Sequence, residues 1–474
     1  MGAAQGDRDV ILGHAVKHDH DDADAAGARA DLHGGDLRLH LERASGMHRA
    51  GEVEQALAMY LTARPALGDH PELENQIGIC HLQCARFDEA MAAFHHALSL
   101  APEHLAAAEN LARAHLERRE FAAARTRLEA VLARNPHRDD SHRLLGFAHL
   151  HLGDIDAAAR SFLAPMRRRF APGGPGGEGA ADPQQATRTK LRSDVEQLTW
   201  LAGQGLLSGD AATLIALHEQ ALTALPAQTA QRFFFPRPGI AGFEQVYNRL
   251  HMDAPQPCVP GPAINPALDA SAIEDAFFRR GWVCFDDFLT PAALAGVRRF
   301  VMEPTLWFEM KFRNEVGASL RNGLCCPLLL QIAEEIRDRF PALCGSNLFT
   351  GCFSYKYFVS EVGGNVHADR GAVSLNFWVT PDEACLDRER SGLLIWDERV
   401  PRRYFHASTE EIDAIHAQMV NRPGARPHVI PYRGNRAMLF RCDTLHATDR
   451  MSFREGYENR RVSLTFLYGK PGDF

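Results

Sequence analysis

The stretch EFAAARTRLEAVLARNP, residues 120–136, decides the architecture of the N-terminal part of the chain. Its apolar side chains return every three to four residues, which is the spacing of a helix with one buried face, and Pro136 ends it. A similar unit ends at Pro102, one period earlier. We therefore predict helices that repeat at a fixed interval along the chain.

Three columns of residues recur at intervals of 34 within residues 36–168. One column is alanine, a second holds a bulky residue four positions later, and a third holds alanine or glycine. This chemistry suits stacked pairs of antiparallel helices, because small residues are needed where helices cross. In period and chemistry the segment resembles four tetratricopeptide repeats, which implies an all-α solenoid whose curved surface binds a peptide or protein. The columns are Ala56, Ala90, Ala124 and Ala158; Tyr60, Phe94, Leu128 and Phe162; and Ala44, Gly78, Ala112 and Gly146.

The segments around the repeats differ from them in composition. Residues 1–35 are rich in Ala, Asp, Gly and His without periodicity, so we expect a disordered leader. Residues 169–188 include APGGPGGEGAADPQQ, which has the composition of a flexible linker. We expect residues 189–230 to form a helical pair that caps the solenoid, and residues 231–270 to form a proline-rich connector.

Residues 271–474 change to short strands mixed with helices. Stretches such as FTGCFSYKYFVS, GAVSLNFWVT and RRVSLTFLYG are rich in β-branched and aromatic residues and are separated by turn residues. Many short strands flanked by helices indicate a barrel or a jelly-roll sandwich. We therefore predict a multidomain chain in which an all-α repeat solenoid precedes an α+β domain.

A His-x-Asp pair and a distant histidine stand out in this C-terminal part. His367 and Asp369 lie between two strand-like stretches, and His446 follows another strand and turn. Two histidines and one carboxylate on one face of an iron(II) ion leave positions open for a co-substrate and dioxygen. The alternative is a loop histidine beside a capping aspartate. We favour metal ligands, because the order of the strands brings the three side chains to one sheet edge.

A polar face on the last strand adds a second signal. Side chains alternate along a strand, so Arg461, Ser463 and Thr465 share one face and Arg460 lies on the other. An arginine fork binds a carboxylate through two parallel hydrogen bonds, and a nearby hydroxyl can add a third. We therefore predict that Arg461 and Ser463 bind the distal carboxylate of a co-substrate.

Three further residues are candidates for the co-substrate site. Tyr355 and Tyr357 share one face of an earlier strand, and Asn376 lies on the strand after the His-x-Asp pair. Each of them has an equally good alternative role as a buried sheet residue whose polar tip finds a partner.

Together, His367-Ala368-Asp369, His446 and Arg461-Val462-Ser463 resemble the HxD…H…RxS elements of the 2-oxoglutarate/iron(II) oxygenase superfamily. The wider text, including HADRGAVSLNFWVTPDEACLD and PYRGNRAMLF, looks like a bacterial family that joins tetratricopeptide repeats to such an oxygenase. The resemblance implies a double-stranded β-helix (jelly-roll) domain that uses Fe(II), 2-oxoglutarate and O2. Within that superfamily, repeat modules accompany some protein hydroxylases, which implies by analogy the hydroxylation of a peptide or protein side chain.

Two other functions stay open at this point. The oxygenase can act on a small metabolite or on a glycan or lipid precursor, with the repeats serving for assembly. The chain can also be a non-catalytic interaction scaffold, although the complete HxD, His and RxS set favours an enzyme.

Composition narrows the choice of partners. A formal net charge of −8 gives no general attraction to nucleic acid or to an anionic membrane surface. No stretch approaches the roughly 18–20 apolar residues that a bilayer span requires, and the N-terminal residues lack the pattern of a secretion signal. The ten cysteines include no CxxC pair and suit a reducing compartment. We expect a cytoplasmic protein with neither a nucleic-acid partner nor a membrane span.

Overall fold

The chain divides into two compact units, and the division falls inside one helix, between Phe162 and Leu163. Residues 1–33, most of the expected leader, and residues 172–184, within the expected linker, lie outside the described residues. The computed structural model describes residues 34–171, 185–226, 235–236, 239–253, 256–310, 315–358, 363–422 and 424–471.

The N-terminal unit consists of consecutive helices. From α1 to α7 each helix packs against the next, and Phe147 of α7 packs against Phe162 of α8. The prediction of a helix within residues 120–136 is confirmed, since α6 occupies most of that stretch. The helices are α1 (Gly34–Arg49), α2 (Val53–Leu67), α3 (Pro71–Gln83), α4 (Phe87–Leu100), α5 (Leu105–Glu117), α6 (Phe121–Arg134), α7 (Asp139–His151) and the first half of α8 (Ile155–Phe170).

The columns that repeat in the sequence form the contacts between these helices. A Cβ added at Gly78 on α3 would lie 2.5 Å from the ring of Phe94 on α4. A Cβ added at Gly146 on α7 would lie 2.7 Å from the ring of Phe162 on α8. The glycines therefore allow an aromatic ring to pack directly on the backbone of the neighbouring helix.

Substitutions of two helical glycines are expected to have opposite effects. Gly78→Ala must displace the Phe94 ring at a cost of about 1–3 kcal/mol, which exceeds the gain in helix propensity, so the free energy of unfolding should fall. Gly46→Ala on α1 is the control, because nothing lies within 4 Å of its added Cβ. It should raise the free energy of unfolding by about 0.5–1 kcal/mol. Urea denaturation followed by circular dichroism measures both, and stabilisation by Gly78→Ala would contradict this packing.

The C-terminal unit contains a seven-stranded antiparallel sheet with the order β3-β10-β7-β12-β6-β5-β4. A second antiparallel sheet has the order β11-β8-β9. The prediction of a β-rich C-terminal domain flanked by helices is therefore confirmed. The strands are β3 (Trp282–Phe285), β4 (Glu309–Met310), β5 (Glu315–Ser319), β6 (Phe349–Tyr357), β7 (Val373–Trp378), β8 (Leu393–Arg399), β9 (His428–Ile430), β10 (Ala437–Arg441), β11 (Thr444–Thr448) and β12 (Arg461–Tyr468), with the short pair β1 (Gln185–Ala186) and β2 (Phe235–Pro236) apart from them.

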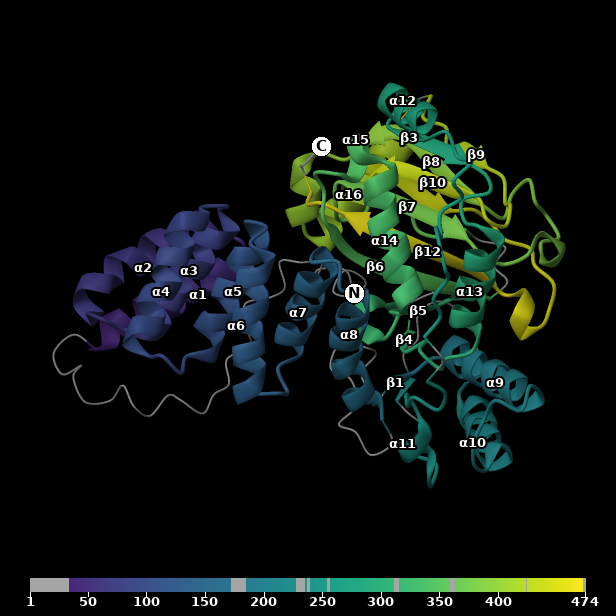
Figure 1. Cartoon of the computed structure of the whole chain (residues 1–474), viewed down its shortest axis with the longest axis horizontal. Coiled ribbons are helices and arrows are strands. Elements are labelled where there is room, and N and C mark those ends of the chain that lie inside the picture. The colour runs from purple at the N-terminus through teal and green to yellow at the C-terminus, as the bar shows by residue number, and fades with distance from the viewer. Residues whose placement is uncertain are drawn as a thin grey trace. The chain divides into compact units, whose positions relative to one another are not determined.

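The two sheets enclose a common apolar core. Trp378, Met438 and Phe440 of the seven-stranded sheet belong to one buried cluster with Leu393 and Ile395 of β8. Helix α14 (Pro327–Arg339) lies across the other face of the large sheet (Figure 1). Side chains that point into the space between the two sheets are therefore shielded from solvent.

The helical pair α9 (Arg188–Gly203) and α10 (Ala211–Ala224) belongs to the same compact unit as the sheets. Arg460, next to the start of β12, donates two hydrogen bonds of 2.9 and 2.6 Å to Glu196 on α9. This placement differs from our expectation that residues 189–230 cap the solenoid. A largely buried ion pair ties α9 to the sheet, and the amphipathic pattern alone did not indicate which body the pair joins.

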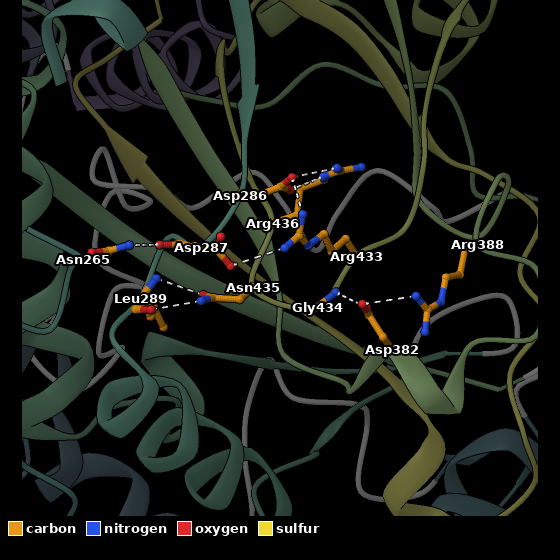
Figure 2. A network of polar contacts seen from close by, with 10 residues as sticks. All are labelled: Asn265, Asp286, Asp287, Leu289, Asp382, Arg388, Arg433, Gly434, Asn435 and Arg436. Carbon is orange, nitrogen blue, oxygen red and sulfur yellow. Dashed lines mark hydrogen bonds and ion pairs between the residues drawn. The ribbon is translucent and has the colours of Figure 1, made fainter. Parts of the chain in front are cut away.

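The turn between β9 and β10 fixes the segment that follows β3 (Figure 2). The Asn435 side chain accepts a hydrogen bond from the Leu289 amide and donates one to the Leu289 carbonyl, both at 2.9 Å. Asn435 has a positive φ of 63°, and its own amide donates to the Trp378 carbonyl. Beside it, Arg436 makes bonds of 2.6 and 3.0 Å to Asp286. Asn435 thus connects the end of β7 to the segment that follows β3.

Asn435→Ala is expected to lower the free energy of unfolding by about 2–4 kcal/mol. It leaves the Leu289 amide and carbonyl without their partner, and alanine tolerates a positive φ poorly. Asn435→Gly loses the same hydrogen bonds but accepts the φ, so it should be less destabilising by about 1 kcal/mol. Denaturant titrations of both variants measure the difference. If neither variant lowers the free energy of unfolding by more than the experimental error, the Asn435 side chain does not have this role.

Candidate functional site

His367, Asp369 and His446 come together at the edge of the second sheet. The backbone N–H of His367 donates to the His446 carbonyl and the reverse bond is also made, both at 2.9 Å. Their candidate ligand atoms and that of Asp369 all lie within 4.8 Å of one another. In the described part of the chain, these three side chains form the group that is close enough to share a metal ion.

Neighbouring groups orient each of the three side chains. His367 Nδ1 lies 2.9 Å from the Asn365 carbonyl, and His446 Nδ1 lies 3.1 Å from the Thr444 carbonyl. Both Nε2 atoms are then directed to the same place, each 3.8 Å from an oxygen of Asp369. Ser374 on β7 donates a 2.8 Å hydrogen bond to Asp369 Oδ2. Such second contacts fix the tautomer and the direction of metal-binding side chains.

The site has a closed side and an open side. His446 is 5% exposed and Asp369 7%, whereas the His367 side chain is 44% exposed. Burial, with the nearby His367 as a smaller cause, lowers the pKa of His446 to about 4. Its imidazole is therefore neutral near pH 7, the form that binds metal ions. The ring of Phe440 lies 4.7 Å from the ring of His446 and covers it on the closed side.

Arg461 is buried in the core between the sheets. It is 1% exposed, and its guanidinium carbon lies 4.7 Å from the ring centre of Tyr357 and 5.5 Å from that of Trp378. Nη2 donates to the Gly392 carbonyl at 3.2 Å, but Nε and Nη1 have no hydrogen-bond partner among the described residues. Buried donors without a partner are costly. Two such donors on one guanidinium fit a bound carboxylate.

Register places the other predicted co-substrate residues on the same inner face. Ser463 on β12 lies opposite Tyr355 on β6 and Trp378 on β7, and Arg461 lies opposite Tyr357. Tyr357 Oη lies 3.2 Å from the Thr448 hydroxyl. The structure therefore brings the predicted tyrosines, arginine and serine together at one end of the core.

Asn376 lies between that end and the candidate ligands. It pairs with Thr465 across β7 and β12, and its Nδ2 donates to the Thr465 hydroxyl at 2.7 Å. Its buried Oδ1 has no partner within the described ranges. Ser374, which holds Asp369, precedes Asn376 by two positions on the same strand and face. A continuous polar row thus runs from the candidate ligands toward Arg461.

Sequence reasoning missed Trp378, which is 1% exposed and whose indole N–H also has no partner in the described part of the chain. It follows Asn376 by two positions, so strand alternation was a usable signal. Gly392 was also missed. Its carbonyl reaches Arg461 from the other sheet, and no local pattern indicates such a contact.

Comparison with known proteins identifies the N-terminal helices. The tetratricopeptide repeat family model matches residues 82–132. The helical array consists of tetratricopeptide repeats. The 34-residue columns on which these repeats were predicted are therefore their packing positions.

Individual relatives overlap with part of the chain. BBSome complex member BBS4 of Mus musculus is 29% identical over 127 residues, which is 27% of this chain and 24% of that protein. This chain thus spans about a quarter of the length of that curated relative. MamA from Desulfovibrio magneticus RS-1 is 19% identical, with 40% of this chain and 94% of that one covered and a TM-score of 0.27. A thermophilic repeat protein from Thermus thermophilus is 18% identical, covering 29% and 76%, with a TM-score of 0.27.

Among the described residues, no helix combines the length and the apolar character that crossing a membrane requires.

Proposed function

We propose that the C-terminal unit is a 2-oxoglutarate- and Fe(II)-dependent dioxygenase that hydroxylates a peptide or protein side chain recognised with the help of the repeats. One observation carries the proposal. A His-Asp-His cluster and a buried arginine with two unpartnered donors lie in the same core, joined by the inner face of β7 and β12. Each feature alone has structural explanations, but a co-substrate that chelates a metal and ends in a carboxylate requires both.

The strand connections support a double-stranded β-helix. From β6 to β12 the chain alternates between the sheets: β7, β10 and β12 join the large sheet, while His367, β8 with β9, and β11 join the second one. Alternation of this kind produces two facing sheets in a jelly roll. The candidate ligands then lie on the second sheet and at its edge, and Arg461 lies on the large one.

The donor set fits iron(II). Two imidazole nitrogens and one carboxylate oxygen on one side of an ion are the ligands of non-haem iron oxygenases. Iron(II), when bound, supplies the redox chemistry by which O2 accepts four electrons: two from the C–H bond that is hydroxylated and two from 2-oxoglutarate, which is decarboxylated to succinate and carbon dioxide. His367 and His446 would hold it through Nε2, and Ser374 would keep Asp369 turned toward it.

The buried surroundings of Arg461 suit the distal carboxylate of 2-oxoglutarate. Its Nε and Nη1 donors, the Ser463 hydroxyl and the Trp378 N–H supply hydrogen bonds to an anion. The rings of Tyr357 and Trp378 exclude water from the guanidinium, which strengthens its attraction for a carboxylate. The half-exposed His367 marks the side from which a substrate side chain would approach.

A turnover assay tests the proposal. Purified protein with Fe(II), 2-oxoglutarate, O2 and ascorbate should form succinate even without the prime substrate, and His446→Ala should not. Adding cell lysate fractions should raise the rate, and the substrate should gain one oxygen atom by mass spectrometry. Activation by protein fractions supports recognition with the help of the repeats, whereas activation by the small-molecule fraction favours a metabolite substrate. No succinate above the His446→Ala background would contradict the enzyme and favour an interaction scaffold.

A further inference from the structure

The segment between β8 and β9 packs against the outer face of the second sheet, behind the candidate ligands. We call residues 400–420 the buttress; they contain the 3-10 helix η4 (Arg402–His406) and helix α16 (Thr409–Val420). The buttress contributes Tyr404, Phe405 and Ile415 to an apolar cluster. The metal-binding chain segments contribute the residues on either side of each histidine, namely Val366, Ala368, Leu445 and Ala447.

The side chains of each metal-binding segment alternate between the candidate metal position and the buttress. Side chains of neighbouring residues in an extended chain point to opposite faces. His367 and His446 therefore face the candidate metal position, and their neighbours anchor the apolar core of the buttress. The buttress is thus part of the packing that holds the two histidines.

Two hydrogen bonds tie the buttress to the residues on both sides of Asp369. The N–H of Ala368 donates to the Tyr404 hydroxyl at 3.3 Å, and Arg370 Nη2 donates to the Phe405 carbonyl at 2.5 Å. The Tyr404 hydroxyl also lies 2.9 Å from His416 Nε2 on α16. Tyr404 is 6% exposed, so the contacts of its hydroxyl are largely shielded from water.

The backbone at Asp369 depends on such contacts. His367 is anchored by its paired bonds to His446 of β11, but His367 itself belongs to no strand. The next amide, that of Ala368, bonds to a side chain of the buttress. We infer that Tyr404 is a positioning residue of the metal centre and that the buttress is a fixed support of the His-x-Asp turn. The inference rests on the metal centre of the proposed function, but not on 2-oxoglutarate.

Cobalt(II) binding to the full-length protein tests this inference. Tyr404→Phe keeps the ring and removes the hydroxyl, which bonds the backbone between two ligands, so it should raise the dissociation constant for Co(II) about tenfold. This is the lower end of the ~10–100-fold that loss of a group bonded directly to a ligand causes. Tyr468→Phe is the matched control. It removes another buried tyrosine hydroxyl, which donates to the Ala333 carbonyl on α14 at 2.9 Å and, among the residues that the structure describes, forms no hydrogen bond with the three candidate ligands. It should leave the dissociation constant unchanged.

Hydrogen exchange supplies a readout without metal. In the apo-protein, a peptide containing Ala368 should exchange faster in Tyr404→Phe than in the wild type, and equally fast in Tyr468→Phe and the wild type. If Tyr404→Phe fails to fold, His416→Leu removes the other partner of the hydroxyl and should show a smaller change of the same sign.

The outcomes separate this inference from the proposed function. An unchanged Co(II) dissociation constant in Tyr404→Phe, or an equal increase in both tyrosine variants, overturns the positioning role even if 2-oxoglutarate binds. A selective increase in Tyr404→Phe supports the role even if the wild type shows no binding of 2-oxoglutarate. Absence of Co(II) binding to the wild type overturns both.

Discussion

His446→Ala is expected to abolish metal binding at the candidate centre and succinate formation with it. The variant loses one of three ligands, so the loss of affinity should exceed the ~10–100-fold that removal of an outer partner causes. The fold should persist, because the paired backbone bonds between residues 367 and 446 do not involve the imidazole. Isothermal titration with Co(II) and the succinate assay measure the two effects.

His218→Ala is the matched control for that loss. His218 is also a buried histidine of the C-terminal unit, 2% exposed, and its Nδ1 lies 2.9 Å from the Leu214 carbonyl. It belongs to α10 and not to the ligand group. Its replacement should reduce stability without changing metal affinity. Equal metal affinity in His446→Ala and His218→Ala would contradict the assignment of His446.

Arg461→Met is expected to weaken 2-oxoglutarate binding and at the same time to stabilise the apo-protein. Binding should lose about 3–5 kcal/mol, more than a hundredfold, because the co-substrate's buried carboxylate is left without its cation. The apo-protein should gain about 1–3 kcal/mol, because an apolar side chain replaces a buried cation whose one hydrogen bond to the described residues goes to the Gly392 carbonyl. Metal-dependent titration with 2-oxoglutarate and urea denaturation of the apo-protein measure the two changes.

The neighbouring residue provides the control. Arg460 is 4% exposed and is paired through two hydrogen bonds with Glu196. Arg460→Met should therefore destabilise the protein and leave the affinity for 2-oxoglutarate unchanged. The stability changes have opposite signs because Arg460 pairs with Glu196 on one side of the sheet, whereas Arg461 lies in the core between the sheets. Destabilisation of the apo-protein by both variants would show that the contacts of Arg461 with Gly392 and the two aromatic rings outweigh the cost of burying its charge.

The sequence alone predicted those features that depend on interactions within one repeat or one strand. The repeats were predictable because Gly78 and Gly146 must leave room for an aromatic ring, and this need recurs once per period. The inward face of β12 was predictable because alternation separates Arg461 from Arg460 in any strand. In each case, the determining interaction lies within one period or one strand.

Contacts between distant segments were not predictable in the same way. The pairing of Glu196 with Arg460 attaches α9 to the sheet. The two residues lie 264 positions apart, and the local sequence around either one does not predict the other as its partner. The hydrogen bond from Ala368 to Tyr404, on which the proposed support of the His-x-Asp turn depends, joins residues 36 positions apart, and no local pattern predicts such a contact.

The most direct test of the oxygenase proposal is an anaerobic titration of the apo-protein with Fe(II) and then 2-oxoglutarate, followed by visible absorption. The proposal predicts a weak charge-transfer band that saturates with 2-oxoglutarate, requires iron, and is diminished in both His446→Ala and Arg461→Met. A protein that binds iron but develops no such band would contradict co-substrate binding at Arg461. A protein that binds neither iron nor 2-oxoglutarate would contradict the assignment of the whole site.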